Sequence, residues 1–253
     1  FAAADVGGNA AGLISGLSVT PVTVAVTVST DTVGGQANGV FYFDGVESPS
    51  SFALIKGQNY IFDQSASSNA SWNSQAHPLM FSTGPDGDHN GNGHYLDGVV
   101  YKLDGTTVTM AGYVSGFASA TTRVVEWVVP TTAPNTLYYW CHSHTGQGDS
   151  FALSTFSDGT FTGIALTGGS GSNATADIEV VNGYISNATI NNAGTGYANS
   201  EILGITGYAA SQVTITSLAG PVAASITISS ISSGTGIAVS PTSVLTGSGA
   251  VLE

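Results

Sequence analysis

Four side chains able to bind a transition metal occur in this sequence, and three of them share one short segment. Cys141, His144 and Gln147 are each separated by two residues, and Cys141 is the only cysteine. His77 lies far upstream. A thiolate, two imidazoles and a weak axial ligand make a type 1 copper site, because copper favours soft sulfur and nitrogen donors. The spacing therefore predicts that Cys141, His144 and Gln147 converge on one point, with His77 as the fourth ligand.

Cys141 also has a purely structural interpretation, since free cysteine is among the most buried residue types. In that case the site is vestigial, and His77 and His144 form hydrogen bonds across the end of a β-sandwich. The sequence leaves both interpretations open. His142, between two of the candidate ligands, is expected to face solvent.

A second candidate ion site is the loop from Asp86 to Asp97, whose pattern D-x-D-x-N-G with an acid at the twelfth position resembles an EF-hand calcium loop. The candidate ligands are Asp86, Asp88, Asn90, Asn92 and Asp97. Two departures count against calcium: Asp97 replaces the usual glutamate, and no flanking helix is expected. The alternative is a solvated turn loop, in which His89 and His94 make local hydrogen bonds.

Short alternating segments joined by turns must position these residues, which indicates an all-β fold. Strands are expected at 39–45, 52–58, 59–64, 77–82, 99–103, 106–110, 123–129 and 137–141. Loops are expected at 65–75 and 84–98, so His77 follows a loop. Cys141 ends the expected strand 137–141. Trp127 and Trp140 are expected in the core.

The N-terminal part is expected to mediate assembly. Residues 1–18 have small side chains and little pattern, as in a flexible arm. The next strand, 22–28, is uncharged and β-branched on both faces, so it is a candidate for an edge strand or for donation to a neighbouring subunit. The candidate assembly residues are Val22, Val24, Val26 and Val28.

The composition changes after about residue 163, and no histidine, cysteine or tryptophan follows. Residues 168–173 resemble a linker, and the short strands beyond it include 225–231 and 237–239. We expect an arm at 1–18, a β-sandwich at 19–165 and a small β domain with an architectural role at 166–253.

Charge, apolar runs and motifs together argue against several function classes. Only three residues are Lys or Arg and the formal net charge is −13, so nucleic-acid binding through phosphate neutralisation is not expected. No apolar run is long enough for a membrane span, and the first residues lack the basic start of a signal peptide. No catalytic triad or paired carboxylates are apparent, so we do not expect an enzyme.

The residues around the candidate copper ligands resemble the cupredoxins, which are Greek-key β-sandwiches with an upstream histidine and a Cys…His…Met or Gln loop. Gln147 matches the substitution found in stellacyanin-like members. The closer resemblance is to a cupredoxin-like module of virion structural proteins of marine phages, particularly cyanophages. It covers about 39–151 and is carried by Tyr-Ile-Phe-Asp-Gln-Ser at 60–65, Asn69, His-Pro-Leu-Met-Phe-Ser at 77–82 and the run from Ala133 to Cys141. The segments 169–183 and 192–197 resemble Gly-rich β repeats of phage tail and appendage proteins.

The resemblance implies a structural subunit of an extracellular assembly, most simply a phage virion appendage, fibre or decoration protein. Its partners would be copies of itself and other virion or surface proteins, paired through β-strands. A cell-surface, pilus-like filament subunit fits the same features. The alternative from another class is a blue-copper electron-transfer protein, with copper as its cofactor. Calcium is a further candidate ion, at the loop from Asp86 to Asp97.

Overall fold

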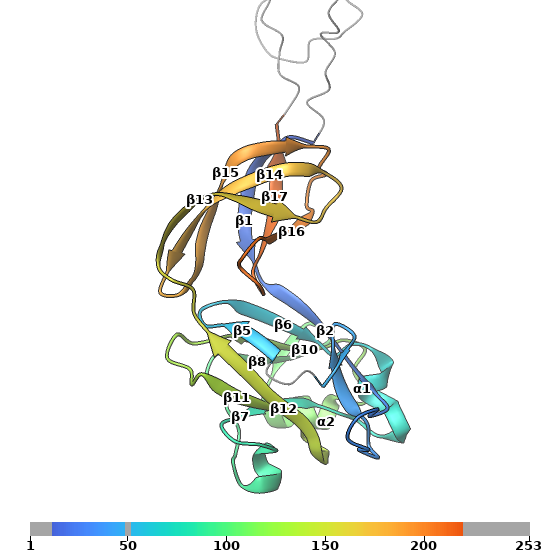
Figure 1. Cartoon of the computed structure of the whole chain (residues 1–253). Helices are drawn as coiled ribbons and strands as arrows, with labels where there is room; N and C mark the ends of the chain where they lie inside the picture. The colour runs from blue at the N-terminus through green and yellow to red at the C-terminus, as the bar shows by residue number, and fades with distance from the viewer. Residues whose placement is uncertain (1–11, 49–51, 220–253) are drawn as a thin grey trace, which may run out of the picture. The chain divides into compact units, whose positions relative to one another are not determined.

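The structure is a computed structural model that describes residues 12–48 and 52–219 (Figure 1). β-strands dominate these residues, so the predicted all-β fold class is confirmed. The strands expected at 225–231 and 237–239 lie outside the described residues, as do residues 1–11 of the expected arm.

The larger sheet of the first part has seven strands in the order β4-β3-β2-β6-β10-β8-β9. Its strands are β2 (Val22–Ser29), β3 (Val40–Phe43), β4 (Val46–Glu47), β6 (Asn59–Asp63), β8 (Val99–Leu103), β9 (Thr106–Val108) and β10 (Arg123–Val128). β2 pairs with β6 in parallel, whereas the other pairs are antiparallel.

The second sheet has four strands in the order β5-β12-β11-β7 and supplies most of the candidate metal ligands. Its strands are β5 (Phe52–Ile55), β7 (Leu79–Ser82), β11 (Thr136–Cys141) and β12 (His144–Ser154). β5 and β12 run parallel, and β11 lies antiparallel between β12 and β7. Consequently, the end of β11 and the start of β12 form a hairpin beside the start of β7.

The two sheets share one apolar core, which makes this part a β-sandwich. Phe43 of β3 contacts Tyr139 of β11 with ring centroids 4.8 Å apart, and Phe81 of β7 contacts Trp127 of β10 at the same distance. Each pair joins one sheet to the other. Trp127 and Trp140 are buried, as predicted.

β2 lies between β3 and β6 in the seven-stranded sheet, and each of these neighbours pairs with one half of it. It pairs with β3 on one side and with β6 on the other. The predicted assembly residues Val22, Val24, Val26 and Val28 are all buried in the shared core. The interpretation of this segment as a strand is correct, whereas its interpretation as an edge strand is wrong, because β2 lies between β3 and β6. Its donation to a neighbouring subunit stays a prediction.

A six-stranded sheet with its own apolar core forms the other part of the described chain, in the order β1-β17-β16-β13-β14-β15. Its strands are β1 (Ile14–Thr20), β13 (Gly159–Thr167), β14 (Ser172–Val181), β15 (Tyr184–Thr195), β16 (Ile202–Ile205) and β17 (Gln212–Leu218). The outer strands β1 and β15 lie side by side, so the sheet is strongly curled (Figure 1).

This sheet differs from the expected domain boundaries at both ends. Residues 14–18, expected in a flexible arm, lie in β1 and pair with β17. Residues 159–165, expected in the sandwich, lie in β13. Sequence-distant pairing of this kind is not visible in a local pattern, since β1 alternates weakly and its partner lies almost 200 residues away.

Short helices occur in three segments that were expected to be irregular or extended. The loop 65–75 contains α1 (Ser67–Ser71) and the 3-10 helix η1 (Trp72–Ser74). The strand expected at 106–110 ends at Val108, because Thr109 caps α2 (Met110–Gly116) by accepting the Gly112 N–H at 3.0 Å. The loop 84–98 contains the 3-10 helix η2 (Gly87–Asn90).

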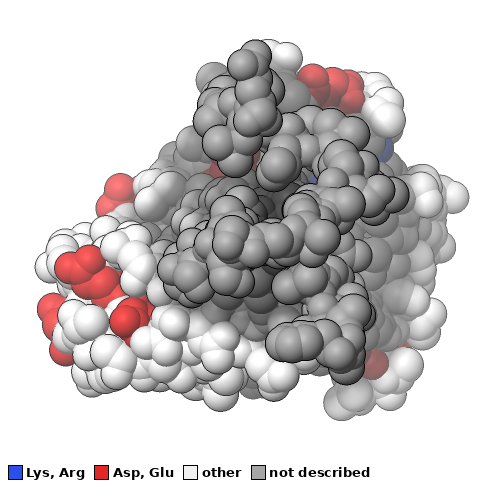
Figure 2. Space-filling view, turned by 90° about the horizontal axis from the view of Figure 1, so that it is seen from above, with Lys and Arg blue, Asp and Glu red and all other residues white. Residues whose placement is uncertain are grey.

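The described surface carries the acidic excess of the sequence. In the view of Figure 2, red acidic groups are prominent among the described residues, whereas blue groups are scarce. Among the residues with a described placement, no helix has the length and apolarity required to cross a bilayer.

Candidate metal centre

Side chains far apart in the sequence meet at one end of the sandwich. His77 immediately precedes Pro78 and β7, Cys141 ends β11, and His144 begins β12. One ligand atom from each of these three residues lies within 4.8 Å of the other two, and all three side chains are buried. Gln147, also fully buried, lies three residues after His144 in β12. The four residues predicted as copper ligands are thus brought together.

The distances place the donor atoms around one point. Cys141 Sγ lies 3.4 Å from His144 Nδ1 and 3.9 Å from His77 Nδ1. The two imidazoles are stacked with ring centroids 4.5 Å apart, and Gln147 Oε1 lies 2.9 Å from His77 Nδ1. Both histidines therefore turn the same ring nitrogen, Nδ1, toward the thiol.

The opposite nitrogen of each imidazole is held by an oxygen acceptor. His77 Nε2 lies 3.1 Å from the carbonyl oxygen of Trp72, and His144 Nε2 is hydrogen-bonded to Gln75 Oε1. A ring nitrogen facing a carbonyl oxygen carries the proton, which leaves Nδ1 of His144 with a free lone pair. His77 has a carbonyl oxygen beside each ring nitrogen, and its Nδ1 can bind a metal when the proton is on Nε2. Such outer hydrogen bonds fix the tautomer and orientation of metal-binding histidines. Gln75 and the Trp72 carbonyl were not expected at the site from the sequence, since no spacing rule marks them.

A network of buried amide groups holds the backbone of His77 in place. Gln64 donates to the carbonyl oxygen of His77 at 2.9 Å and accepts the N–H of Leu79 at 2.9 Å. Asn69 accepts the His77 N–H through its own backbone carbonyl at 2.7 Å, and its side chain donates to Val26 at 2.7 Å. The position of His77 therefore depends on residues of several elements.

A tight hairpin turn positions Cys141 and His144. Cys141 pairs with His144 across the two residues His142 and Ser143, and the register shifts between Trp140 and Cys141. The His142 N–H donates to the carbonyl oxygen of Pro78 at 2.9 Å, which ties the turn to the residue after His77. This turn brings both hairpin ligands onto one side.

Burial governs the protonation of the site. It raises the pKa of the Cys141 thiol to about 12, against the opposing effect of the Ser143 and His144 backbone N–H groups. Burial and then the neighbouring His77 lower the pKa of His144. Without a metal, the structure therefore favours a neutral thiol beside neutral imidazole at His144.

The donor set fits a soft or borderline metal ion. Gln147 Nε2 is buried and has no hydrogen-bond partner among the described residues, whereas Gln147 Oε1 lies 2.9 Å from His77 Nδ1. With the His77 proton on Nε2, both Nδ1 and Oε1 offer lone pairs that a cation can bind. One thiolate, two imidazole nitrogens and one amide oxygen suit copper, and they can also hold zinc.

The predicted calcium ligands do not converge. The Asp86 carboxylate accepts the Gly146 N–H, the Asp88 carboxylate contacts His94 Nε2 at 2.6 Å, and the Asn90 and Asn92 amides donate to the carbonyl oxygen of Pro85. Asp97 is exposed. Among the His, Cys, Asp and Glu side chains of the described ranges, His77, Cys141 and His144 form the one group of three or more that could hold a metal ion. The structure does not support the calcium prediction, because the Asp86 and Asp88 carboxylates and the Asn90 and Asn92 amides face other partners.

The remaining histidines surround Trp140. His89 and His94 contact its indole with ring centroids 5.3 and 5.2 Å away, and His142 stacks against it at 6.2 Å. His89 Nε2 donates to the carbonyl oxygen of Cys141 at 3.1 Å. The local hydrogen bonds predicted for His89 and His94 are confirmed, whereas His142 is half-buried rather than solvent-facing.

No protein-family model matches this chain, and no curated protein shows significant similarity to it. The case for its function therefore depends on the site itself.

Proposed function

We propose that this protein binds a single copper ion through His77, Cys141, His144 and Gln147 and acts as a one-electron carrier with a cupredoxin-like sandwich. The observation that carries the proposal is the shared orientation of the two buried imidazoles. Each holds Nε2 against an oxygen acceptor and turns Nδ1 toward Cys141 Sγ. Copper would supply the one-electron redox chemistry.

The protein's own groups would make that chemistry efficient by limiting rearrangement. The hairpin, the amide network and the outer hydrogen bonds hold the donors in place before a metal arrives. A preformed set of neutral nitrogen and oxygen donors around one thiolate accommodates either charge of the ion with little movement. Burial keeps bulk water from the ligand atoms.

Binding must release the proton of the Cys141 thiol, because only the thiolate is a good metal ligand. Since burial raises the pKa of this thiol, copper affinity is expected to fall as pH falls. His144, with its lowered pKa, competes less for a proton at neutral pH than an ordinary histidine does.

The test is to titrate metal-free full chain with Cu(II) and to record visible absorption and bound metal. We expect one copper per chain and an intense thiolate-to-copper band that the variant Cys141→Ser lacks. His142→Ala is the matched control, since His142 is adjacent to Cys141 but outside the ligand set, and it should keep the band. A colourless protein, or one that retains zinc against excess copper, would reject the proposal.

A second candidate is a structural role in an extracellular assembly, favoured by the six-stranded part. That part has a complete apolar core, yet its residues include no histidine, cysteine or tryptophan. An architectural unit joined to a metal-binding sandwich is consistent with the phage-like segments of the sequence. We propose a virion appendage, fibre or decoration subunit, or a cell-surface filament subunit, with copies of itself as partners. No catalytic step belongs to either proposal.

The assembly proposal is tested by sedimentation and electron microscopy of the purified full chain. Regular oligomers or filaments are expected. A protein that stays monomeric at high concentration and is absent from virions or surface filaments would exclude this role. Val22–Val28 would take part only as a donated strand, because β2 lies between β3 and β6.

A further inference from the structure

We propose that Asp86 is a positioning residue for the metal centre: it fixes the ligand hairpin and biases the bound copper toward the oxidised state. This inference rests on the proposed copper function. Asp86 lies in the loop whose sequence resembles a calcium site, but its carboxylate faces the hairpin that carries three of the four ligands.

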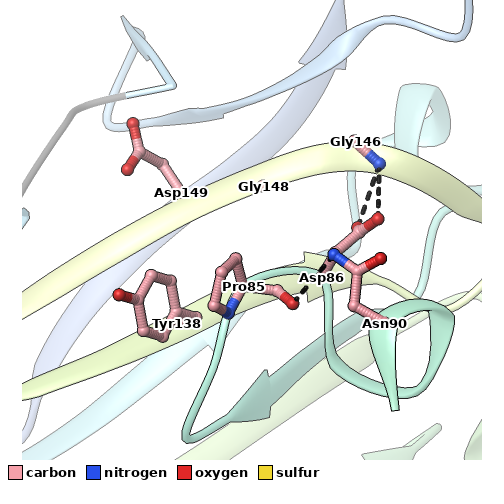
Figure 3. A pocket seen from close by; sticks show the side chains of 7 residues that line it. All are labelled: Pro85, Asp86, Asn90, Tyr138, Gly146, Gly148 and Asp149. Carbon is pink, nitrogen blue, oxygen red and sulfur yellow. Dashed lines mark hydrogen bonds between the residues drawn. The ribbon is translucent and has the colours of Figure 1, made fainter. Parts of the chain in front are cut away.

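The contact is made at the backbone between two ligands. Both carboxylate oxygens of Asp86 accept the N–H of Gly146, at 3.0 and 2.9 Å (Figure 3). Gly146 has φ +77°, a left-handed conformation, and directly precedes Gln147. The direction in which the chain leaves Gly146 determines where the Gln147 side chain enters the site. Asp86 therefore controls the amide ligand through its neighbour.

The loop around Asp86 touches the hairpin at two further points. Gly87 packs so closely against the indole of Trp140 that a Cβ atom there would lie 2.0 Å from Trp140 Cε2. His89 Nε2 donates to the carbonyl oxygen of Cys141 at 3.1 Å. We call Asp86, Gly87 and His89 the loop clamp. It contacts the hairpin at Trp140, at Cys141 and at Gly146, on both sides of the ligand pair Cys141 and His144.

The backbone of Asp86 is adapted to this role. Its φ of +62° and ψ of 15° are left-handed, a region in which Asp and Asn are far more common than most other non-glycine residues. The following Gly87, with φ +46°, lets the chain turn against Trp140. The carboxylate is thus held at the hairpin by backbone geometry rather than by a flexible side chain alone.

The charge of Asp86 has a second consequence. The Asp86 carboxylate is bonded to the backbone of the hairpin between the ligands His144 and Gln147, so its negative charge lies beside the segment that would hold the ion. A copper site carries one more positive charge when oxidised than when reduced. A nearby carboxylate therefore stabilises the oxidised state more and lowers the reduction potential.

Two substitutions separate the clamp from the charge. Asp86→Asn keeps an oxygen acceptor and tolerates the left-handed backbone, but it removes the charge. Asp86→Gly keeps the backbone conformation and removes both acceptor and charge. The control is Asp149→Asn: Asp149 lines the same pocket of about 220 Å³, but its carboxylate accepts from Ser150 and not from the hairpin (Figure 3).

The loop clamp is tested first in the metal-free full chain, by measuring the protection of the Gly146 amide against hydrogen exchange. We expect the wild type, Asp86→Asn and Asp149→Asn to protect this amide, and Asp86→Gly to lose the protection. Unchanged protection in Asp86→Gly would overturn the clamp. Because no metal is needed, this result is independent of the copper proposal.

The effect on the metal is read next, by Cu(II) affinity and reduction potential. Loss of a partner that orients a ligand weakens metal binding about 10- to 100-fold, so we expect a decrease in that range for Asp86→Gly and little change for Asp86→Asn. Asp86→Asn should raise the potential more than Asp149→Asn does. Equal potentials in these two variants, or wild-type affinity in Asp86→Gly, would refute the positioning role. Absence of a thiolate-to-copper band in the wild type would instead refute the proposed function.

Discussion

Gln64 offers a direct test of how the sandwich holds His77, because one buried side chain makes four hydrogen bonds. Its Nε2 donates to Asn69 Oδ1 at 3.0 Å and to the His77 carbonyl oxygen at 2.9 Å. Its Oε1 accepts the Leu79 N–H at 2.9 Å and the Tyr113 O–H at 3.1 Å. The substitution Gln64→Met retains similar length and volume while removing all four bonds.

The expected loss in the free energy of unfolding follows from the buried donors that no longer have Gln64 as their acceptor. The Leu79 N–H and the Tyr113 hydroxyl belong to buried residues, and each unsatisfied buried donor costs about 1–3 kcal/mol. The two acceptors add less, because a carbonyl oxygen with one lone pair unused is better tolerated. We therefore expect Gln64→Met to lower the free energy of unfolding of the sandwich by about 4 kcal/mol. Copper affinity should fall with it, since His77 loses its support.

Tryptophan fluorescence during urea unfolding is the assay, because the two apolar cores need not unfold together. All three tryptophans, Trp72, Trp127 and Trp140, lie in the sandwich, so their signal reports this part alone. The matched control is Gln212→Met in β17 of the six-stranded sheet, which should leave the fluorescence transition unchanged. A loss below about 1 kcal/mol for Gln64→Met would show that the network is not energetically important.

Two further predictions concern the packing and the protonation of the centre. Gly87→Ala should destabilise the sandwich by at least about 2 kcal/mol more than Gly91→Ala, because both positions have positive φ but only Gly87 lies against Trp140; equal urea midpoints would contradict this. The Cys141 pKa of about 12 lies above the ordinary value near 9, so the stability that the buried thiol contributes is complete below about pH 9 and is lost as pH rises toward 12. The metal-free wild type should therefore lose stability relative to Cys141→Ala as pH rises from about 8 to 10, and parallel pH profiles of the two urea midpoints would refute the assignment.

Local patterns predicted several strands of the sandwich, and β2, β6, β8, β10 and β11 lie close to their expected bounds. β12, which carries two of the candidate ligands, was not among the expected strands. Period-two alternation reports which faces are buried, but it does not identify the neighbouring strand. The segment 22–28 is therefore recognisable as a strand from its sequence, whereas its place between β3 and β6 is not. Residues 14–18 show the same limit, since their partner β17 lies at the far end of the described chain.

The sequence by itself determined which four side chains form the candidate centre. The spacing of Cys141, His144 and Gln147 on one hairpin, with His77 before another strand, was sufficient to predict that these four would meet. Short-range geometry explains the success: two residues between ligands at a tight turn leave few ways to place the side chains.

Only the tertiary structure decided how that centre is oriented and which neighbours hold it. The imidazole tautomers depend on Gln75 and the Trp72 carbonyl, and the hairpin depends on Asp86. The loop 86–97 has calcium-like spacing, but in the fold the carboxylates of Asp86 and Asp88 face protein donors. A ligand motif is local, whereas the availability of an oxygen or a lone pair depends on what packs against it, and that is determined by contacts between distant segments.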